Sequence, residues 1–350
     1  MKTIVLKSMF LSSILLLNTC MTFVSAQDYS FSQFYEQPML RNPALAGIFE
    51  GDIKVAALFK NQWQSVTVPF QTGSLSVEHR FPIGKGNDFM TLGLQTFLDA
   101  AGDIQLKRSQ IAPVLNFHKS LNEEYNSYLS LGFMGGFTSS QFDITKMQFD
   151  DQFVNGSFDP NASTQQTFVR TSVNYWDLST GLTYGMSVGD NTDFYVGAAL
   201  FHFNRPKVAF YANNESTTLQ SKFAVNAGLT SATSDLNRLI VFFDYLQQGG
   251  NNNAMFGGYY GTDIKQDYDN NDKITLYLGA FYRLHDGFVP IVKLDYYKLT
   301  FGVSYDIATS QLRTASQLRG GLEFTATYRA TLNNRSEEAK KMRCVGGFRF

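Results

Sequence analysis

Apolar and polar residues alternate with a period of two across residues 274–307. From 274 to 284 the even positions hold Ile, Leu, Leu, Ala, Tyr and Leu, and the odd ones hold Thr, Tyr, Gly, Phe and Arg. The alternation resumes after turns at 285–287 and 297–298. Because successive side chains of a strand point to opposite faces, each run has one apolar face and one mixed face. The pattern predicts three consecutive antiparallel strands.

Two all-β architectures fit this alternation. In a soluble sandwich the apolar face packs on a core and the polar face meets water. In an outer-membrane barrel the apolar face meets lipid and the other face lines the lumen. The runs are about nine to eleven residues long, which is what a tilted strand needs to cross a bilayer. Their mixed face holds Gly, Thr and Ser with occasional Arg, Lys and Asp, and this composition favours a barrel lumen over open water.

The same alternation returns along most of the chain and gives about 14 strands between residues 53 and 332. We therefore predict a transmembrane antiparallel outer-membrane β-barrel; an even strand count places both termini in the periplasm. Besides the three opening runs, the expected strands lie near 53–59, 75–81, 90–98, 109–117, 129–137, 176–186, 193–203, 219–231, 236–246, 254–264 and 320–332.

Loop lengths test the strand count independently. Barrels of this class have long extracellular loops and short periplasmic turns. If the first strand runs outward, the longest connections, 139–174, 204–218 and 308–318, all fall outside, and short ones such as 189–192, 233–235 and 297–298 fall inside. One exception is 265–273, a longish connection on the periplasmic side, which leaves a miscounted strand pair open.

Composition and the first residues agree with a barrel in the outer membrane. The chain has 32 Phe, 18 Tyr and 28 Gly but only 17% charged residues, which suits aromatic belts at the interfaces and small residues in the lumen. Residues 1–26 read as a secretory signal peptide, with Lys2 and Lys7, an apolar core and Val-Ser-Ala before Gln27. Beyond it no apolar run is long enough for a spanning helix. No basic stripe with interleaved aromatics indicates nucleic-acid binding.

Two flanking segments lie outside the predicted barrel of residues 53–332. Residues 27–52 are polar and aromatic, and Pro38 and Pro43 argue against a central strand, so we predict a periplasmic leader or partial plug at or inside the mouth. Residues 333–350 are expected to form a periplasmic tail. Once the signal peptide is removed only Cys344 remains, which excludes an internal disulfide.

We find no catalytic constellation, so we expect no enzyme activity and no cofactor. The four His residues are scattered, and motifs such as HExxH, GxSxG, a P-loop or CxxC are absent from the sequence. Residues 267–272 begin like a calcium loop, but Asp272 stands where that loop has Gly and Leu278 where it has Glu. A solvated acidic turn is the favoured interpretation, and no metal site is predicted.

The charged residues expected to face the lumen are of both signs. Charges in a narrow, partly dehydrated space should be paired. We therefore predict a lateral ion-pair network that fills the barrel rather than a selectivity ring. The candidates are Arg283, Lys293, Asp295, Asp306, Arg319, Glu323 and Arg329.

Two blocks resemble a known family. NPALAG is followed after a strand by KNQW within residues 42–63, and residues 304–328 read SYDIATSQLRTASQLRGGLEFTATY. Together they resemble the PorP/SprF family of outer-membrane proteins of the type IX secretion system. One departure is that Cys344 is followed by Val rather than Pro. The family-like positions are Asn42, Pro43, Gly47, Asn61, Gln62, Trp63, Tyr305, Asp306, Ser310, Arg313, Gly320 and Gly321.

The resemblance implies an accessory barrel of the secretion and gliding apparatus. Some members work with its periplasmic ring, and others hold the C-terminal domain of a large secreted adhesin at the cell surface. We favour the adhesin partner because the loop at 139–174 carries aromatic side chains in a polar background, which suits a binding surface. A loop that folds back to plug its own barrel, and a passive channel or hydrophobic-solute transporter, stay open as alternatives. The candidate contact residues are Phe142, Phe149, Phe153, Phe158 and Phe168.

Overall fold

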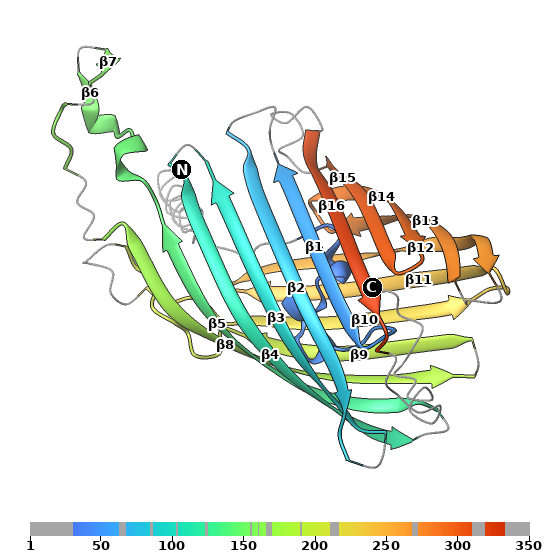
Figure 1. Cartoon of the computed structure of the whole chain (residues 1–350). Helices are drawn as coiled ribbons and strands as arrows, with labels where there is room; N and C mark the ends of the chain where they lie inside the picture. The colour runs from blue at the N-terminus through green and yellow to red at the C-terminus, as the bar shows by residue number, and fades with distance from the viewer. Residues whose placement is uncertain are drawn as a thin grey trace, which may run out of the picture.

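The computed structural model describes residues 31–62, 68–84, 87–102, 104–122, 125–154, 156–159, 161–165, 170–189, 191–210, 217–267, 272–309 and 319–332. Within these ranges, 14 antiparallel strands form one closed barrel (Figure 1). The first and last of them, β1 and β16, pair along ten residues from Ile53↔Ala330 to Gln62↔Gly321 and close the wall. The predicted fold class is therefore confirmed.

Each barrel strand pairs with its sequence neighbours. A two-stranded hairpin, β6 (Phe153–Val154) and β7 (Ser157–Phe158), interrupts the series between β5 and β8. The barrel strands are β1 (Ile53–Gln62), β2 (Phe70–Pro82), β3 (Phe89–Ala101), β4 (Leu106–Asn122), β5 (Ser127–Gln141), β8 (Ser172–Val188), β9 (Thr192–Phe201), β10 (Lys222–Ala232), β11 (Asn237–Gln248), β12 (Asn251–Asp267), β13 (Asp272–Arg283), β14 (Gly287–Tyr296), β15 (Leu299–Ala308) and β16 (Arg319–Ala330).

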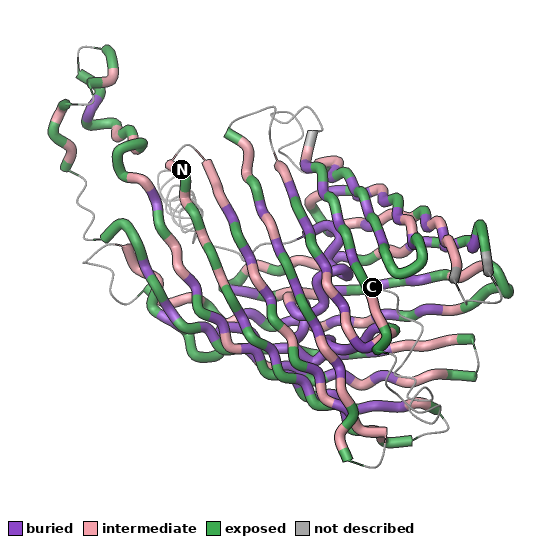
Figure 2. The backbone as a smooth tube through the Cα atoms, viewed as in Figure 1, coloured by how far each residue is buried: buried purple, intermediate pink, exposed green. Residues whose placement is uncertain are grey.

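Buried and exposed positions alternate along the strands (Figure 2). On β13 the side chain of Leu278 is 56% exposed, whereas its neighbour Tyr277 is 1% exposed. The exposed set is dominated by Leu, Phe, Val and Tyr, which is the apolar band that a lipid-facing wall needs. The faces of the run at 274–307 are therefore those that the sequence pattern predicts. No helix in the described ranges is long and apolar enough to cross a membrane.

The two ends of the barrel carry connections of different length. We call the end with the 142–171 and 202–221 connections the outer rim, and the end with the 189–191, 233–236 and 297–298 turns the inner rim. Long connections face the cell exterior in such barrels. The sequence pattern predicts a long inner turn at 265–273, and this prediction is wrong. The β12–β13 ladder continues to Asp267↔Asp272, so most of these residues belong to the two strands. A register shift between Asp263 and Lys265 keeps the two strands paired to their ends.

Residues 31–49 lie inside the barrel, and we call this segment the plug. Figure 1 shows it in dark blue, enclosed by the wall. It contains three short helices, η1 (Phe34–Glu36), α2 (Pro38–Arg41) and η2 (Pro43–Leu45). Nearly every plug residue is buried, including the polar ones. The plug then leads to Gly51 and Asp52 and into β1, which starts at the inner rim.

Candidate functional site: the plug and its contacts

The plug folds through its prolines and one asparagine. Pro38 and Pro43 occupy the first position of α2 and η2, where a fixed φ and a missing N–H cost nothing. Asn42 caps η2, because its side-chain oxygen accepts a hydrogen bond from the Ala44 N–H at 2.8 Å. The residues that argue against a strand at 38–43 therefore build a compact helical turn.

Asn42 also joins the plug to the wall. Its side-chain amide donates to Oγ1 of Thr183 on β8 at 3.1 Å and to Oδ1 of Asn226 on β10 at 3.0 Å. Asn226 in turn donates to the backbone carbonyl of Arg41 at 3.1 Å. All these groups are buried, so the loss of one leaves a desolvated partner without its hydrogen bond.

The backbone that follows Asn42 lies directly against strands β4 and β5. The Asn116 side-chain amide donates to the carbonyls of Ala44 and Ala46, both at 2.8 Å. A Cβ on Gly132 would collide with the backbone of Pro43 and Ala44, so only glycine permits this approach. Close packing of a backbone on a strand is a common reason for glycine there.

Gly47 ends this motif in a left-handed conformation, with φ +85°. Its N–H donates to the carboxylate of Glu78 on β2 at 2.7 Å. Glu78 also lies 3.7 Å from Lys54 of β1, and both side chains are fully buried. The sequence NPALAG therefore makes contacts from β2 to β10, and its role is to seat the plug.

Aromatic rings hold the first half of the plug. The ring of Tyr35 stacks on Phe242 and on Phe281, with centroids 5.3 Å apart in both cases. Phe34 meets Phe281 edge-on at 5.3 Å. The rings come from the plug, β11 and β13, so the apolar core of this molecule lies in its lumen.

Two buried ion pairs connect the plug to strands β11 and β14 of the wall. The Arg41 guanidinium donates to both carboxylate oxygens of Asp244 on β11, at 2.8 and 2.6 Å. The Lys293 ammonium of β14 lies 2.6 Å from Glu36. Burial raises the pKa of Glu36, but Lys293 and then Lys54 act more strongly together and leave it below its ordinary value. Glu36 is therefore a carboxylate, as its position opposite Lys293 requires.

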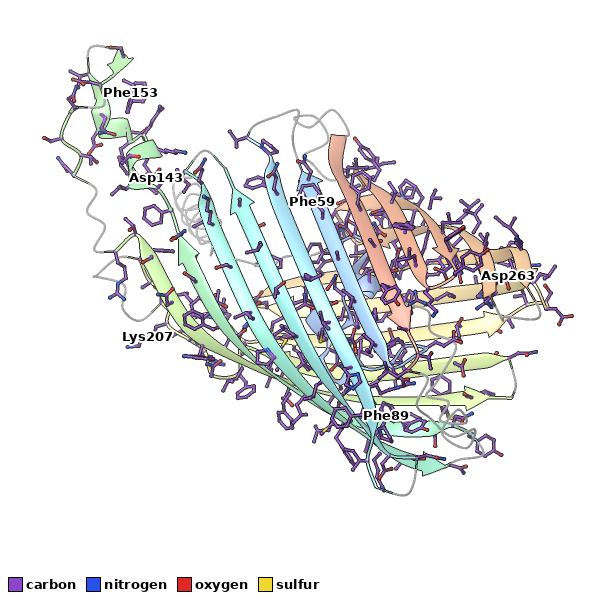
Figure 3. The ribbon with its side chains drawn as sticks, viewed as in Figure 1. Phe59, Phe89, Asp143, Phe153, Lys207 and Asp263 are labelled. Atoms are coloured by element: carbon purple, nitrogen blue, oxygen red, sulfur yellow. The ribbon has the colours of Figure 1, made fainter. Side chains whose placement is uncertain are left out.

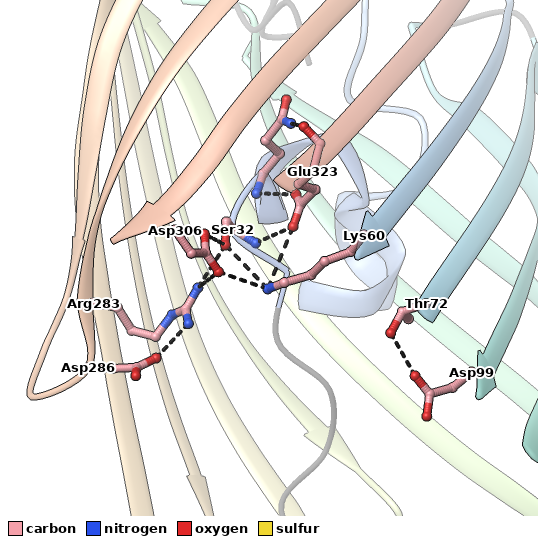
Figure 4. A network of polar contacts seen from close by, with 9 residues as sticks. Ser32, Lys60, Thr72, Asp99, Arg283, Asp286, Asp306 and Glu323 are labelled. Carbon is pink, nitrogen blue, oxygen red and sulfur yellow. Dashed lines mark hydrogen bonds and ion pairs between the residues drawn. The ribbon is translucent and has the colours of Figure 1, made fainter. Parts of the chain in front are cut away.

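A polar network surrounds the beginning of the plug (Figure 4). The N–H groups of Ser32 and Gln33 donate to the two carboxylate oxygens of Glu323, at 2.9 and 2.6 Å. The Ser32 hydroxyl donates to Asp306 and accepts from Arg283 at 2.8 Å. Lys60 lies 3.2 Å from Asp306 and 3.7 Å from Glu323. Strands β1, β13, β15 and β16 are thereby joined through the plug.

The two sequence blocks that suggested a family meet at the β1–β16 closure. Gln62 pairs with Gly321 and Asn61 with Leu322. Lys60 and Glu323 are opposite each other in the same register. Segments more than 250 residues apart therefore form one seam, with the plug bound to its inner side.

The comparisons with known proteins agree with this architecture. The chain matches the sequence profile of the "Type IX secretion system membrane protein PorP/SprF" over residues 23–328. It belongs to the PorP/SprF family. The family and the fold are those of outer-membrane secretion barrels rather than of a known enzyme class, and the protein is located in the outer membrane. No curated protein matches the sequence.

Solved structures with a similar shape are distant from this PorP/SprF barrel. A FadL homologue of Pseudomonas aeruginosa is 12% identical with a TM-score of 0.44, and the alignment covers 82% of this chain and 92% of that one. The CymD monoaromatic hydrocarbon channel is 10% identical with a TM-score of 0.47, covering 85% and 94%. BamA of Haemophilus ducreyi, lacking POTRA domains 1–3, is 7% identical with a TM-score of 0.40, covering 80% and 71%.

The predicted lumen charges whose side chains are described face inward, but most of them find partners outside the predicted set. Asp306 lies 3.6 Å from Arg283, and both residues belong to the predicted set. Lys293 pairs with Glu36 of the plug instead. Glu323 lies beside Lys60 of β1. Asp295 accepts from Thr300 at 2.6 Å and Arg329 donates to the same hydroxyl at 2.9 Å. The side chain of Arg319 lies outside the described residues.

The sequence analysis missed the partners of these charges. Lys54, Lys60 and Glu78 share the parity of the lumen-facing residues on β1 and β2, so the alternation itself could have identified them. Glu36 and Arg41 lie in an irregular segment, where no periodicity indicates which side chains are buried.

Some of the other family-like positions lie in the barrel wall, and the rest lie outside the described residues. Tyr305 points outward and is 38% exposed, whereas Asp306 points inward. Gly320 lies beside Gly321 on β16. Trp63, Ser310 and Arg313, like Phe168, lie outside the described residues.

The aromatic loop stands beyond the outer rim, and the interior is occupied by the plug. Figures 1 and 3 show β6, β7 and Phe153 well away from the barrel wall. The Phe153 and Phe158 rings pack together at 5.8 Å, and Phe153 is 56% exposed. Phe142 is different, because it is buried at the base of the loop against Phe210 at 5.1 Å. Phe149 is half-buried.

Proposed function

We propose that this PorP/SprF barrel anchors a large secreted adhesin at the cell surface by binding its C-terminal domain. The observation that carries the proposal is the combination of an occupied lumen with an aromatic hairpin held outside the outer rim. An interior occupied by the chain's own buried plug favours action through the surface over the passage of solutes. Membership of the secretion family supports a secreted protein as the partner.

The contacts of the plug support a permanent structural role. Buried carboxylates of the wall bind Arg41 and the N–H groups of Ser32 and Gln33. A buried ammonium group of the wall binds Glu36. Opening the lumen would separate these charges from their partners, and breaking one buried pair costs about 3–5 kcal/mol. A solute channel would need to meet that free-energy cost each time the plug opened the lumen.

The exposed apolar side chains of the β6–β7 hairpin support this loop as the surface that binds the adhesin. Phe153 and Val154 are 56% and 45% exposed at its tip, and Ile144 nearer the base is 41% exposed. Exposed apolar groups gathered on a projecting loop are typical of interaction sites. Asp151 accepts from Thr164 at 3.0 Å and orders the return of the loop.

Replacing residues 144–169 with a short Gly-Ser linker tests the proposal. Phe142 and the Phe142 N–H to Thr171 carbonyl hydrogen bond at the base would remain. We expect whole-cell antibody labelling to show loss of the adhesin while the heat-modifiable, folded barrel persists. Adhesin display at wild-type level would refute docking on this loop.

A double substitution of Phe153→Ser and Val154→Ser gives a milder test. Its matched control is Val188→Ser, an apolar residue that is 51% exposed at the inner rim. Only the hairpin variant should reduce display. A pull-down that instead recovers components of the periplasmic ring, and no secreted protein, would favour the ring-linked role.

A further inference from the structure

The contacts between the plug and the wall join positions at very different separations along the chain. Those with β1 and β2 are local, because Lys60 and Ser32 are 28 positions apart and Gly47 and Glu78 are 31 apart. Contacts that close short loops cost the least chain entropy and tend to form early in folding. The plug can therefore dock on β1 and β2 before the later strands have formed.

The last strand, β16, meets the plug from the far end of the chain. Its lumen-facing residues Glu323, Thr325 and Thr327 are buried. The Thr325 hydroxyl donates to Oε1 of Gln33 at 2.9 Å, and the Gln33 side-chain amide donates to the Glu323 backbone carbonyl at 3.1 Å. The Thr327 hydroxyl donates to Glu36 at 3.1 Å. Alternate positions of β16 therefore all bind the plug.

The plug distinguishes one register of the β1–β16 seam from its neighbours. A slip of one residue would turn Glu323 and Thr325 toward lipid, because side chains alternate along a strand. A slip of two residues keeps the faces but moves the Glu323 carboxylate about 7 Å away from the N–H groups of Ser32 and Gln33. The main-chain ladder alone would be satisfied in that slipped register, so the discrimination comes from the plug and from side chains across the seam.

Gly302 of β15 shows how closely the plug is fitted to the closing strands. A Cβ at this position would lie 2.4 Å from Oε1 of Gln33 and 2.4 Å from Oγ1 of Thr325. The glycine therefore leaves the space in which these two side chains meet. A Cβ on Gly73 of β2, by contrast, would have nothing within 4 Å.

We propose that the plug is the template on which the barrel closes. It docks first on β1 and β2, and then captures β16 through Glu323 in a single register. Pairing the first strand with the last closes the longest loop in the sheet and has the largest entropy cost. A plug already held at β1 supplies buried side-chain contacts to β16 at that step. The inference concerns assembly of the barrel and does not depend on the partner at the cell surface.

Disulfide trapping of the seam tests the template. The chain without residues 1–26 carries Cys344→Ser, so an introduced pair holds its only cysteines. Ala57→Cys/Ala326→Cys reports the native register, because these outward-facing residues are Cα partners. Ala57→Cys with Phe324→Cys or Tyr328→Cys reports a slip of two residues, since such diagonal pairs are too distant to bridge in the native ladder. The unfolded chain is refolded from urea into dimyristoylphosphatidylcholine vesicles under mild oxidation.

Two variants remove the contact from either side. Glu323→Thr deletes the carboxylate but leaves Lys60 beside Asp306, and Gln33→Pro deletes the N–H and the side-chain amide but leaves Lys60 and Glu323 in place. We expect each to raise the slipped fraction about tenfold, the effect of losing a hydrogen bond to a charged group. The matched control is Asp263→Thr on β12, another buried carboxylate, which binds Thr275 at its neighbouring strand. The slipped fraction should not change in this control.

Three results would overturn the template. A wild-type register in both Glu323→Thr and Gln33→Pro would show that the ladder sets itself. Slippage in Glu323→Thr alone would assign the register to the Lys60–Glu323 pair across the seam rather than to the plug. Pulsed hydrogen exchange on the refolding wild-type chain gives the order of events and needs no variant to fold. We expect amides of residues 42–47 to be protected before those of 321–330, and the reverse order would mean that the plug packs after closure.

Discussion

Replacing Asp244 with Asn should release the plug, because it leaves the Arg41 guanidinium buried without its counter-charge. The two side chains are 3% and 6% exposed, and the pair is bidentate. Removing one partner of such a pair costs about 3–5 kcal/mol. Since each 1.4 kcal/mol is tenfold in an equilibrium constant, about 4 kcal/mol would raise the released fraction roughly a thousandfold.

Hydrogen exchange of the amides in residues 31–49 measures this release, and planar-bilayer conductance gives a second readout. An exposed pair provides the control, because Lys119 and Asp88 are 56% and 22% exposed. Asp88→Asn should change exchange little, as surface pairs contribute about 0–1 kcal/mol.

The double variant Arg41→Met/Asp244→Leu separates loss of charge pairing from loss of packing. Apolar replacement of both partners of a buried pair is often neutral or stabilising, so exchange should return toward the wild-type rate. If Asp244→Asn exchanges like the wild type, or if the double variant is as open as the single one, the pair does not hold the plug.

Three further predictions concern the same interior. Gly132→Ala should displace the plug backbone at a cost of about 1–3 kcal/mol, seen as faster exchange of residues 42–46, whereas Gly135→Ala on the same strand should not, since its Cβ would meet only Leu178 at 3.6 Å. The wild-type protein should show little ohmic conductance in planar bilayers; a large steady conductance would contradict a bound plug. Because the pKa of Glu36 is lowered from 4.5, the stabilisation from its pair with Lys293 is complete above that value and is lost only as pH falls through the lower folded pKa. Glu36→Gln should therefore raise conductance at neutral pH, and its difference from the wild type should vanish in strong acid.

The amino-acid sequence by itself determined the wall of this protein. A period of two over about ten residues assigns each side chain to lipid or lumen, because successive residues of a strand point to opposite faces. Lys293 and Asp306 were therefore placed inward correctly from their neighbours alone. Turn residues between the runs gave the strand count, and loop lengths gave the orientation.

The tertiary structure alone decided what fills the wall. Alternation states that a side chain faces the lumen but not which side chain lies across from it. Ser32 and Glu323 are 291 positions apart, and their contact depends on barrel closure and on the path of the plug. The plug has no periodic pattern, because its backbone hydrogen bonds go to caps and wall side chains such as Asn42 and Asn116. Long-range complementarity of this kind exists only once the sheet has closed around the segment it holds.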